Sequence, residues 1–508
     1  MTDNVRVELQ PMGRTLGVRR GCPLQDVLFA QGVEFPCGGH GRCRGCRVRL
    51  LAGSLPVTPE DARLLSPADT ADGWRLACRA RADGDLRIEL AQWEASILAD
   101  DTVLSFVPRS GLGIAVDLGT TTLAAQLLDL RTGCVLAVRT ALNDQARHGA
   151  DIMSRIGFAM QGGGRRELTR VIRDQIGGLA SALVADAGGA ARADPVADVV
   201  IVGNTAMHHL FADLDVGPLS RFPFEPEDDG LLSFSADALG WSLPGNPRVR
   251  FLPCLGGFVG SDLLAGLLAT RLHESDEPAA LVDLGTNGEI VVGNRGRMLC
   301  ASTAAGPAFE GARVSMGMRA VTGAISEVRV RDGRMHCRVL GDVAPRGLCG
   351  SGLVDAVAAG LDLGRIDPTG RLSHGDALEL APPVALRQAD IRELQLAKAA
   401  IAAGLRILLE QWGARPDQLA RLHLAGAFGN YINRASARRI GLLDFPDATV
   451  LPSGNTALLG AKLVLLANDA DDGTFAALRS RVRHVSLGED ARFQDIFVDE
   501  MRFPQPTP

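Results

Sequence analysis

One turn sequence occurs twice in this chain, and its repetition restricts the possible folds more than any other feature. Residues 117–122 read Asp-Leu-Gly-Thr-Thr-Thr, and residues 283–288 read Asp-Leu-Gly-Thr-Asn-Gly. Each turn follows a short apolar run and precedes further stretches that alternate as strands do, at 123–139 in the first copy and 289–302 in the second. Helical patterns follow in both copies. Internal duplication of one α/β unit accounts for this arrangement.

The length and composition exclude several classes of protein. The chain has 508 residues, enough for about three or four compact domains. Hydrophobic residues make up 46% and charged residues 22%, which excludes disorder and coiled coil as the main architecture. The 53 basic and 59 acidic side chains give a net charge of -6, without the basic surplus that binds a phosphate backbone. We therefore expect no nucleic-acid partner.

The chain contains no predicted targeting or membrane segment. Residues 1–6 do not combine a basic stretch with a following apolar stretch, so no secretory signal is predicted. The most apolar segments, 263–269 and 457–467, are well below the ~18–20 residues that span a membrane. We expect a cytoplasmic protein with no membrane partner. Its ten cysteines should then be reduced, so a cysteine cluster would indicate a metal or redox site.

The N-terminal fifth of the chain is a separate unit. Residues 5–18 alternate like a strand hairpin, residues 24–30 suit one short helix, and further strands are predicted between residues 48 and 90. These elements predict a small mixed sheet in a domain at residues 1–93. Residues 94–110 are predicted to form a linker.

Four cysteines gather in this N-terminal unit. Cys37, Cys43 and Cys46 lie on one loop, and Cys78 follows a later strand. The loop is rich in glycine, which allows backbone N–H groups to turn toward the charge of thiolates and sulfide. Such hydrogen bonds help to set the reduction potential of an iron-sulfur cluster.

The spacing of these cysteines resembles that of the 2Fe-2S ferredoxins of the β-grasp fold. The first gap is one residue longer than the plant-type spacing, and it matches the adrenodoxin-like variant better. The resemblance implies that Cys37, Cys43, Cys46 and Cys78 are the metal ligands of a 2Fe-2S cluster. Two other interpretations stay open, a four-cysteine zinc site and a redox disulfide between Cys43 and Cys46. Cys22 lies outside the cluster and is assigned to packing.

The duplicated turns have the residue types of a site for phosphate and magnesium. Asp117 and Asp283 each end a buried strand, where a carboxylate can lie beside hydrated Mg²⁺ and act in catalysis. The residues that follow offer backbone and side-chain donors to phosphate oxygens; they are Gly119, Thr120, Thr121, Gly285, Thr286 and Asn287. A single turn of this kind is also common in ordinary hairpins, so coincidence within an α/β domain is the alternative.

A third glycine-rich element lies at residues 422–430, where Gly426 and Gly429 leave room for a nucleoside to approach the backbone. It lacks the Gly-Lys-Ser/Thr ending of a P-loop. Together the three elements resemble the phosphate 1, phosphate 2 and adenosine elements of the ASKHA superfamily of sugar kinases, actin and heat-shock chaperone ATPases. That resemblance implies two RNase H-like lobes that clasp ATP. Lobe I is predicted at 111–278, and lobe II at 279–508 with a return to lobe I near the C-terminus.

The whole chain resembles the reductive activators of corrinoid proteins, which join a ferredoxin domain to an ASKHA-type ATPase. The resemblance rests on six further strings; they are Pro-Cys-Gly-Gly at 36–39, Asn-Asp-Gln at 143–145, Gly-Ala-Asp-Ile at 149–152, Gly-Asn-Thr-Ala-Met at 203–207, Ala-Ala-Gly-Pro-Ala-Phe-Glu-Gly at 304–311 and Cys-Gly-Ser-Gly-Leu at 349–353. The fold class expected is therefore α+β and α/β, with an N-terminal β-grasp ferredoxin domain before a two-lobed ASKHA ATPase.

This resemblance implies an activity, its cofactors and its partners. The chain would use a 2Fe-2S cluster, ATP and Mg²⁺ to pass one electron to Co(II) of a corrinoid protein or corrinoid-dependent methyltransferase, and so restore Co(I). An upstream low-potential electron donor is implied, and a homodimer is left open. A methionine synthase, an O-demethylase and a methylamine or betaine methyltransferase system all fit as partners. The alternatives are a small-molecule kinase and an ATP-switched chaperone, each with a redox-sensing iron-sulfur domain.

Three further expectations concern residues outside these motifs. His208 and His209 are expected to serve helix packing and the surface rather than to bind cobalt. Lys398 is expected to extend along a solvated face of the helix predicted at 391–411. Residues 218–247, rich in Asp, Gly, Phe and Pro, are predicted to form a surface insertion with little regular structure.

Overall fold

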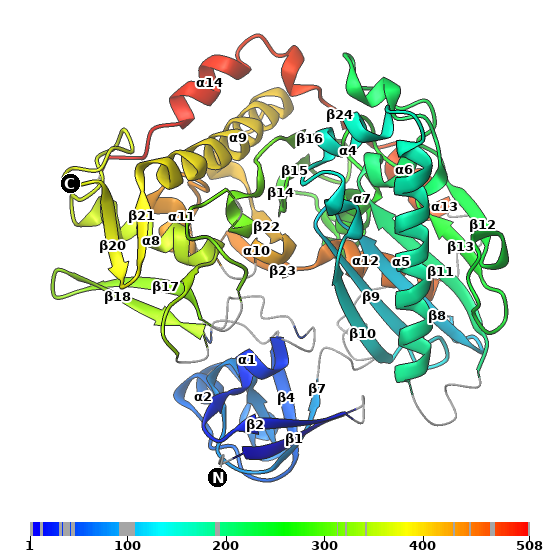
Figure 1. Cartoon of the computed structure of the whole chain (residues 1–508), viewed down its shortest axis with the longest axis horizontal. Coiled ribbons are helices and arrows are strands. Elements are labelled where there is room, and N and C mark those ends of the chain that lie inside the picture. Colours follow the sequence, from blue (N-terminus) through cyan, green and yellow to red (C-terminus); the bar gives the residue numbers. More distant parts are fainter. Residues whose placement is uncertain are drawn as a thin grey trace. The chain divides into compact units, whose positions relative to one another are not determined.

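The computed structural model describes residues 4–10, 14–29, 33, 41, 46–90, 107–187, 194–311, 313–320, 323–340, 343–429, 432–446, 449–467 and 473–505. The chain forms two compact units (Figure 1). Of the described residues, the first unit contains those up to residue 271 and those of Asn455–Val482, and the second contains those of Leu272–Gly454 and those from residue 483 on. Within the first unit we distinguish an N-terminal domain, residues 4–90, from lobe I, residues 107–271 and 455–482. The second unit is lobe II.

The N-terminal domain is built on a five-stranded sheet in the order β2-β1-β7-β4-β5. Its strands are β1 (Asn4–Gln10), β2 (Arg14–Arg19), β4 (Arg47–Ala52), β5 (Trp74–Leu76) and β7 (Leu86–Leu90). Strands β1 and β7 are parallel, and the other neighbours are antiparallel. The alternating apolar residues of β1 are buried, and helix α1 (Leu24–Phe29) follows the hairpin and the short strand β3 (Cys22–Pro23). The hairpin and helix predicted from the sequence are confirmed.

Lobe I contains a six-stranded sheet in the order β10-β9-β8-β11-β13-β12. The strands are β8 (Leu112–Leu118), β9 (Thr122–Asp129), β10 (Val135–Leu142), β11 (Val196–Gly203), β12 (Leu232–Ser235) and β13 (Arg248–Phe251). One face packs against α4 (Ile152–Ala159), α5 (Gly164–Asp186) and α6 (Thr205–Ala212). Helices α7 (Ser261–Thr270) and α12 (Thr456–Ala467) pack on β11, and α12 also packs on β8. Helix α13 (Gly473–Arg479) contacts α7.

Helices α7 and α12 approach each other closely because α12 carries a glycine at their contact. A Cβ atom on Gly460 would lie 2.1 Å from the carbonyl oxygen of Ala265. Strand β8 has a similar requirement, since a Cβ on Gly113 would lie 2.6 Å from Leu465. Helix α12, which follows the strands of lobe II in the sequence, is therefore an integral layer of lobe I.

Lobe II contains a second six-stranded sheet, in the order β23-β22-β14-β15-β16-β24. The strands are β14 (Ala279–Leu284), β15 (Gly288–Gly293), β16 (Met298–Thr303), β22 (Arg421–Ala425), β23 (Val450–Gly454) and β24 (Val482–His484). The long helix α9 (Gln388–Trp412) packs on β15 and β16, and α14 (Phe493–Glu500) lies beside α9 (Figure 1). Helix α8 (Gly350–Asp362) packs on the small sheet of β17 (Ala324–Arg331), β18 (Arg334–Val339) and β19 (Gly347–Leu348).

The two lobes repeat one strand topology. In lobe I, β8 is antiparallel to β9 and parallel to β11, which is parallel to β13. In lobe II, β14 is antiparallel to β15 and parallel to β22, which is parallel to β23. Strands β10 and β16 complete the antiparallel meanders. The duplicated α/β unit predicted from the turn sequences is confirmed.

The two predictions about the periphery have different outcomes. Residues 218–247 have little regular structure, as predicted, since they contain two short 3-10 helices and the four-residue strand β12, which pairs with β13. They are not purely a surface segment, however, because Trp241 is buried and its Nε1 donates to the carbonyl oxygen of Arg173 at 2.9 Å. The apolar residues between the turn formers cover the end of the lobe I core. Lys398 is 1% exposed rather than solvated, because α14 covers this part of α9. Its Nζ donates to the carbonyl oxygens of Glu500 and, at 3.0 Å, Arg502.

Two other expectations have the following outcomes. His208 and His209 are both fully buried, which confirms the packing role, although neither reaches the surface. Residues 91–106, most of the predicted linker, lie outside the described residues. Among the described helices, none combines the length and apolar composition needed to cross a membrane.

Candidate functional site

Two of the four clustered cysteines lie side by side in the N-terminal domain. Cys46 immediately precedes β4, and Cys78 lies in the short helix η1 (Ala77–Arg79) that follows β5. The antiparallel pairing of β4 with β5 brings these points together, and the N–H of Ala77 donates to the carbonyl oxygen of Cys46 at 3.0 Å. Both cysteines are buried, and neither forms a disulfide with a described residue. Two thiols in this arrangement fit the ligand set expected for a 2Fe-2S cluster.

The loop that would supply the other two ligands is fixed at one described position. Gly41 has φ +64°, and a Cβ there would lie 2.9 Å from Glu60 Cγ. Its carbonyl oxygen accepts a hydrogen bond of 2.7 Å from Arg63 Nη2. Cys37 and Cys43 lie outside the described residues, and the described residues contain no cluster of three potential metal ligands. Their assignment as ligands therefore stays a prediction.

In lobe I, the turn between β8 and β9 is held by two asparagines. The N–H of Gly119 donates to the carbonyl oxygen of Thr122 at 3.1 Å, and a Cβ on Gly119 would lie 2.5 Å from that oxygen. Asn143 Nδ2 donates to the carbonyl oxygen of Gly119 at 3.0 Å, and its N–H donates to the carbonyl oxygen of Thr121 at 2.9 Å. Asn204 Nδ2 donates to Thr120 Oγ1 at 2.9 Å. The turn is thus fixed by contacts distant in sequence.

Two polar residues, Asn455 and Asp262, interact with the Asp117 carboxylate of this turn. Asn455, which directly precedes α12, donates from Nδ2 to Asp117 Oδ2 at 2.8 Å. Burial raises the pKa of Asp117 to about 6, while the hydrogen bond from Asn455 acts in the opposite direction. Asp262, in the first turn of α7, also has a raised pKa, first because of burial and then because of the negative charge of Asp117. A bound cation would favour the ionised form of both carboxyl groups.

Sequence reasoning did not identify Asp262 and Asn455. Each lies at the start of an apolar helix, just after a short glycine-containing segment, the signal that could have drawn attention to them. They reach the site only through the fold, since 338 positions separate Asn455 from Asp117. Asp262 adds a second carboxyl group whose pKa responds to the charge of Asp117.

In lobe II, the turn between β14 and β15 also begins at a glycine whose N–H donates across the turn, but this turn is one residue tighter than the turn of lobe I. The N–H of Gly285 donates to the carbonyl oxygen of Asn287 at 3.0 Å. Thr286 Oγ1 donates to Glu310 Oε1 at 2.6 Å, so the turn is tied to the short helix η9 (Pro307–Glu310). Glu310 belongs to one of the strings singled out in the sequence. Asp283 lies opposite Glu289 in the β14–β15 pair.

Helix α10 (Gly426–Gly429) brings the third glycine-rich element to Asp283. Asp283 and Ala425 are register partners in the parallel pair β14–β22, and α10 begins at the next residue. Gly426 has φ +85°, and a Cβ there would lie 2.5 Å from Asp283 Oδ1 and 2.6 Å from the carbonyl oxygen of Leu284. Gly429, at the end of α10, packs near Leu424. The backbone at Gly426 thus lies directly against the carboxylate.

This geometry is suited to phosphate chemistry in both lobes. In each, a carboxylate ends a parallel-paired strand and a glycine turn follows it, which leaves backbone and hydroxyl groups beside the carboxylate. Carboxylate oxygens with water are ligands that Mg²⁺ prefers. At the Asp283 site, the backbone of Gly426 also lies directly against the carboxylate. The residues present fit a magnesium nucleotide.

Comparisons with known proteins cover the whole chain. Residues 7–83 match the 2Fe-2S iron-sulfur cluster binding domain, residues 112–275 match the RACo middle region, and residues 277–508 match the C-terminal domain of RACo, the ASKHA domain. The corrinoid activation enzyme RamQ of Eubacterium limosum is 36% identical over 449 residues, which cover 80% of this chain and 74% of that protein.

Two further proteins are similar over most of their length. The Co(II) methylated amine-specific corrinoid protein reductase of Methanosarcina barkeri is 26% identical over 423 residues, which cover 77% of each chain. The solved structure of a reductive activator for corrinoid, iron-sulfur protein aligns over 99% of both chains, with 26% identity and a TM-score of 0.72. The fold class predicted from the sequence, a ferredoxin domain followed by an ASKHA domain, is confirmed.

Proposed function

The chain belongs to the family of reductive activators of corrinoid proteins, and from this we propose that it passes one electron to Co(II) of a corrinoid partner and restores Co(I) in an ATP-dependent step. The observation that carries the proposal is the presence, on one chain, of the buried pair Cys46 and Cys78 and of two lobes with carboxylate turns. Neither the kinase nor the chaperone alternative accounts for the similarity to corrinoid activators over 80% of the chain.

We propose that Cys37, Cys43, Cys46 and Cys78 hold the 2Fe-2S cluster. When bound, the cluster accepts and donates one electron at a time. The antiparallel pairing of β4 with β5 brings the buried Cys46 and Cys78 together, so these two thiolates would need little reorganisation to bind the cluster. Arg63 fixes the cysteine loop at Gly41. Capping-box hydrogen bonds stabilise the N-termini of α2 (Pro59–Leu64) and α3 (Pro67–Ala71), the two helices between β4 and β5.

For ATP, the proposed site uses the residues of both turns. Asp117 and Asp283 would orient the water shell of Mg²⁺, and Asn455 fixes the rotamer of Asp117. The N–H and hydroxyl groups of the turns would donate to phosphate oxygens; these residues are Gly119, Thr120, Thr121, Gly285, Thr286 and Asn287. Gly426 and Gly429 would line the approach of the nucleoside.

Coupling to ATP has an energetic reason. Each uphill gap of about 59 mV in a one-electron transfer costs about 1.4 kcal/mol. A gap of a few hundred millivolts therefore costs several kcal/mol, which is within the range of binding energy linked to a nucleotide. We propose that the nucleotide state of the lobes controls whether the electron reaches the corrinoid. A ferredoxin domain without this control needs no ATPase on the same chain.

The test measures cobalt reduction with and without nucleotide. The holoprotein, a low-potential reductant and a Co(II) corrinoid protein are mixed, and Co(I) is trapped as methyl-Co(III). Reduction is expected only with ATP and Mg²⁺. ATP should be hydrolysed to ADP and inorganic phosphate, with no phosphate group transferred to another molecule. Cys46→Ser should lose reduction and keep basal ATP hydrolysis, whereas Asp283→Ala should lose reduction and keep a reducible cluster. Equal reduction rates with and without nucleotide would refute the proposal and favour the sensor or kinase interpretation.

A further inference from the structure

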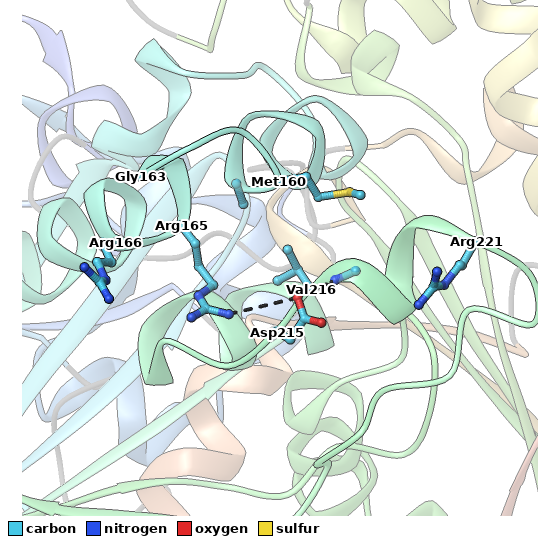
Figure 2. A pocket seen from close by; sticks show the side chains of 9 residues that line it. Met160, Gly163, Arg165, Arg166, Asp215, Val216 and Arg221 are labelled. Carbon is cyan, nitrogen blue, oxygen red and sulfur yellow. Dashed lines mark hydrogen bonds and ion pairs between the residues drawn. The ribbon is translucent and has the colours of Figure 1, made fainter.

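Lobe I carries a surface pocket that neither proposed site uses. Its volume is about 540 Å³ (Figure 2). The end of α4 and the start of α5 form one side of the pocket, and residues 215–221 form the other. The side chains of Met160, Arg166 and Arg221 on its lining are exposed, while Val216 is buried. The exposed lining makes this an open depression that can accept a group from another molecule.

The charges in this pocket are predominantly positive and only partly neutralised. Arg165 Nε lies 2.8 Å from Asp213 Oδ1, and Arg165 Nη1 lies 4.0 Å from Asp215 Oδ1. Arg166 and Arg221, by contrast, have no side-chain hydrogen bond or ion pair with any residue that the structure describes, and no dashed line reaches them in Figure 2. Two guanidinium groups at this pocket are therefore free to bind an anionic group.

Exposed apolar side chains accompany these arginines. Met153 and Met160, seven residues apart on and just after α4, lie on the same helix face and are 49% and 59% exposed. Phe222, next to Arg221, is 67% exposed, more than any other large hydrophobic side chain in the described part of the chain. Single exposed apolar residues need no explanation. Met, aromatic residues and Arg together are the types enriched in protein interfaces.

We propose that this surface, the arginine face formed by Met160, Arg166, Arg221 and Phe222, docks an acidic segment of the corrinoid partner protein. The inference rests on the proposed function, since it assigns the docking surface for that partner. Guanidinium groups bind carboxylates in bidentate geometry, and an approaching acidic partner would be steered by unpaired arginines. Met160 and Phe222 supply the apolar contact area that the arginines lack.

The experiment compares charge reversal on this face with charge reversal elsewhere on lobe I. The double variant Arg166→Glu/Arg221→Glu is prepared as full-length holoprotein, with the single variant Arg131→Glu as a control, because Arg131 is an exposed arginine outside the face that pairs with Asp129 at 3.8 Å. The probes are purified Co(II) corrinoid proteins from methylamine, betaine and O-demethylase systems, and the one reduced fastest by the wild-type protein is used. Binding and ATP-dependent reduction are measured from ~50 to 300 mM salt.

The double variant is expected to need at least ~10-fold more partner for half-maximal reduction, and to lose most of the salt dependence of wild-type binding. Basal ATP hydrolysis and the cluster spectrum should be unchanged in both variants, which verifies folding. Wild-type affinity in the double variant would overturn the docking inference alone. Two other results would also overturn it. The double variant could bind the partner normally but lose binding of inorganic phosphate, or it could bind the partner normally but change its self-association. If the wild-type protein reduces no corrinoid protein, the proposed function itself fails.

Discussion

Replacing Gly426 by alanine is expected to disrupt the Asp283 site through a contact whose size the structure defines. The new Cβ would lie 2.5 Å from Asp283 Oδ1 and 2.6 Å from the carbonyl oxygen of Leu284, whereas ordinary contact begins at 3.4 Å. The carboxylate or the backbone must therefore move by roughly 0.9 Å. A misplacement of about 1 Å in a catalytic site can cost about 100-fold in rate, or about 2.7 kcal/mol.

A second effect of this substitution must be separated from the contact. Gly426 has φ +85°, and an L-residue with that backbone costs about 1–2 kcal/mol of folding stability. Gly413→Ala is the matched control, because Gly413 has φ +90° and no neighbour within 4 Å of its Cβ position. In thermal unfolding, both variants should lose the stability that this backbone conformation costs. Only Gly426→Ala should also lose about 100-fold in Mg-ATP turnover.

The assay is steady-state phosphate release from the holoprotein at saturating Mg-ATP, together with thermal unfolding of each variant. The cluster absorption spectrum should be unchanged, because the cysteines belong to the N-terminal domain. If Gly426→Ala and Gly413→Ala hydrolyse ATP at the same rate, Gly426 has no role beside Asp283. The reasoning from the glycine contact would then be refuted.

Three other substitutions test separate features. Cys46→Ser should abolish the visible absorption and the reduced S = 1/2 paramagnetic resonance signal of the cluster, while Cys22→Ser should leave both intact; equal loss would contradict the ligand assignment. Asp117→Asn should abolish ATP turnover and raise the free energy of unfolding at pH 8 by about 1 kcal/mol without nucleotide. The pKa of this carboxyl is raised from 3.8 to about 6 in the folded protein, so its ionisation destabilises the native state fully above about pH 6, and the gain in denaturant unfolding should fade as the pH falls from 6 toward 3.8. Lys398→Met should cost about 2–3 kcal/mol in denaturant unfolding, since it removes the buried ammonium group that donates to the carbonyl oxygens at the end of α14; a loss no larger than that of exposed Arg406→Met would contradict this.

The local motifs could be predicted from the sequence because their chemistry lies within a few consecutive residues. The two Asp-Leu-Gly-Thr turns predicted the duplicated topology, since each turn carries its own glycine and its own strand pair. The positions of Cys46 and Cys78 follow from antiparallel pairing of two recognisable strands. In these cases the local pattern and the final contact involve the same or adjacent segments.

The missed features depend on contacts between distant segments. Asn455 reaches Asp117 because α12 packs on β8, and no local pattern at Asn455 indicates that packing. Lys398 is periodic with the polar residues of its helix, yet α14 covers it from the end of the chain. Residues 218–247 have the composition of a loop, but Trp241 is buried because it fills a space beside Arg173. In each case tertiary packing overrides the local composition.

The discontinuity of lobe I has a consequence for how the protein is made on the ribosome. Synthesis runs from the N-terminus, and domains generally fold as they emerge. The sheet of lobe I is complete at Phe251 and α7 at Thr270, yet α12 is translated nearly 200 residues later. Until α12 is translated, nothing packs on the surface around Ala265 and Gly113, where Gly460 and Leu465 of α12 lie in the finished protein. The nascent chain must therefore hold an unfinished lobe I, with apolar surface uncovered, while all strands of the lobe II sheet except β24 are being synthesised.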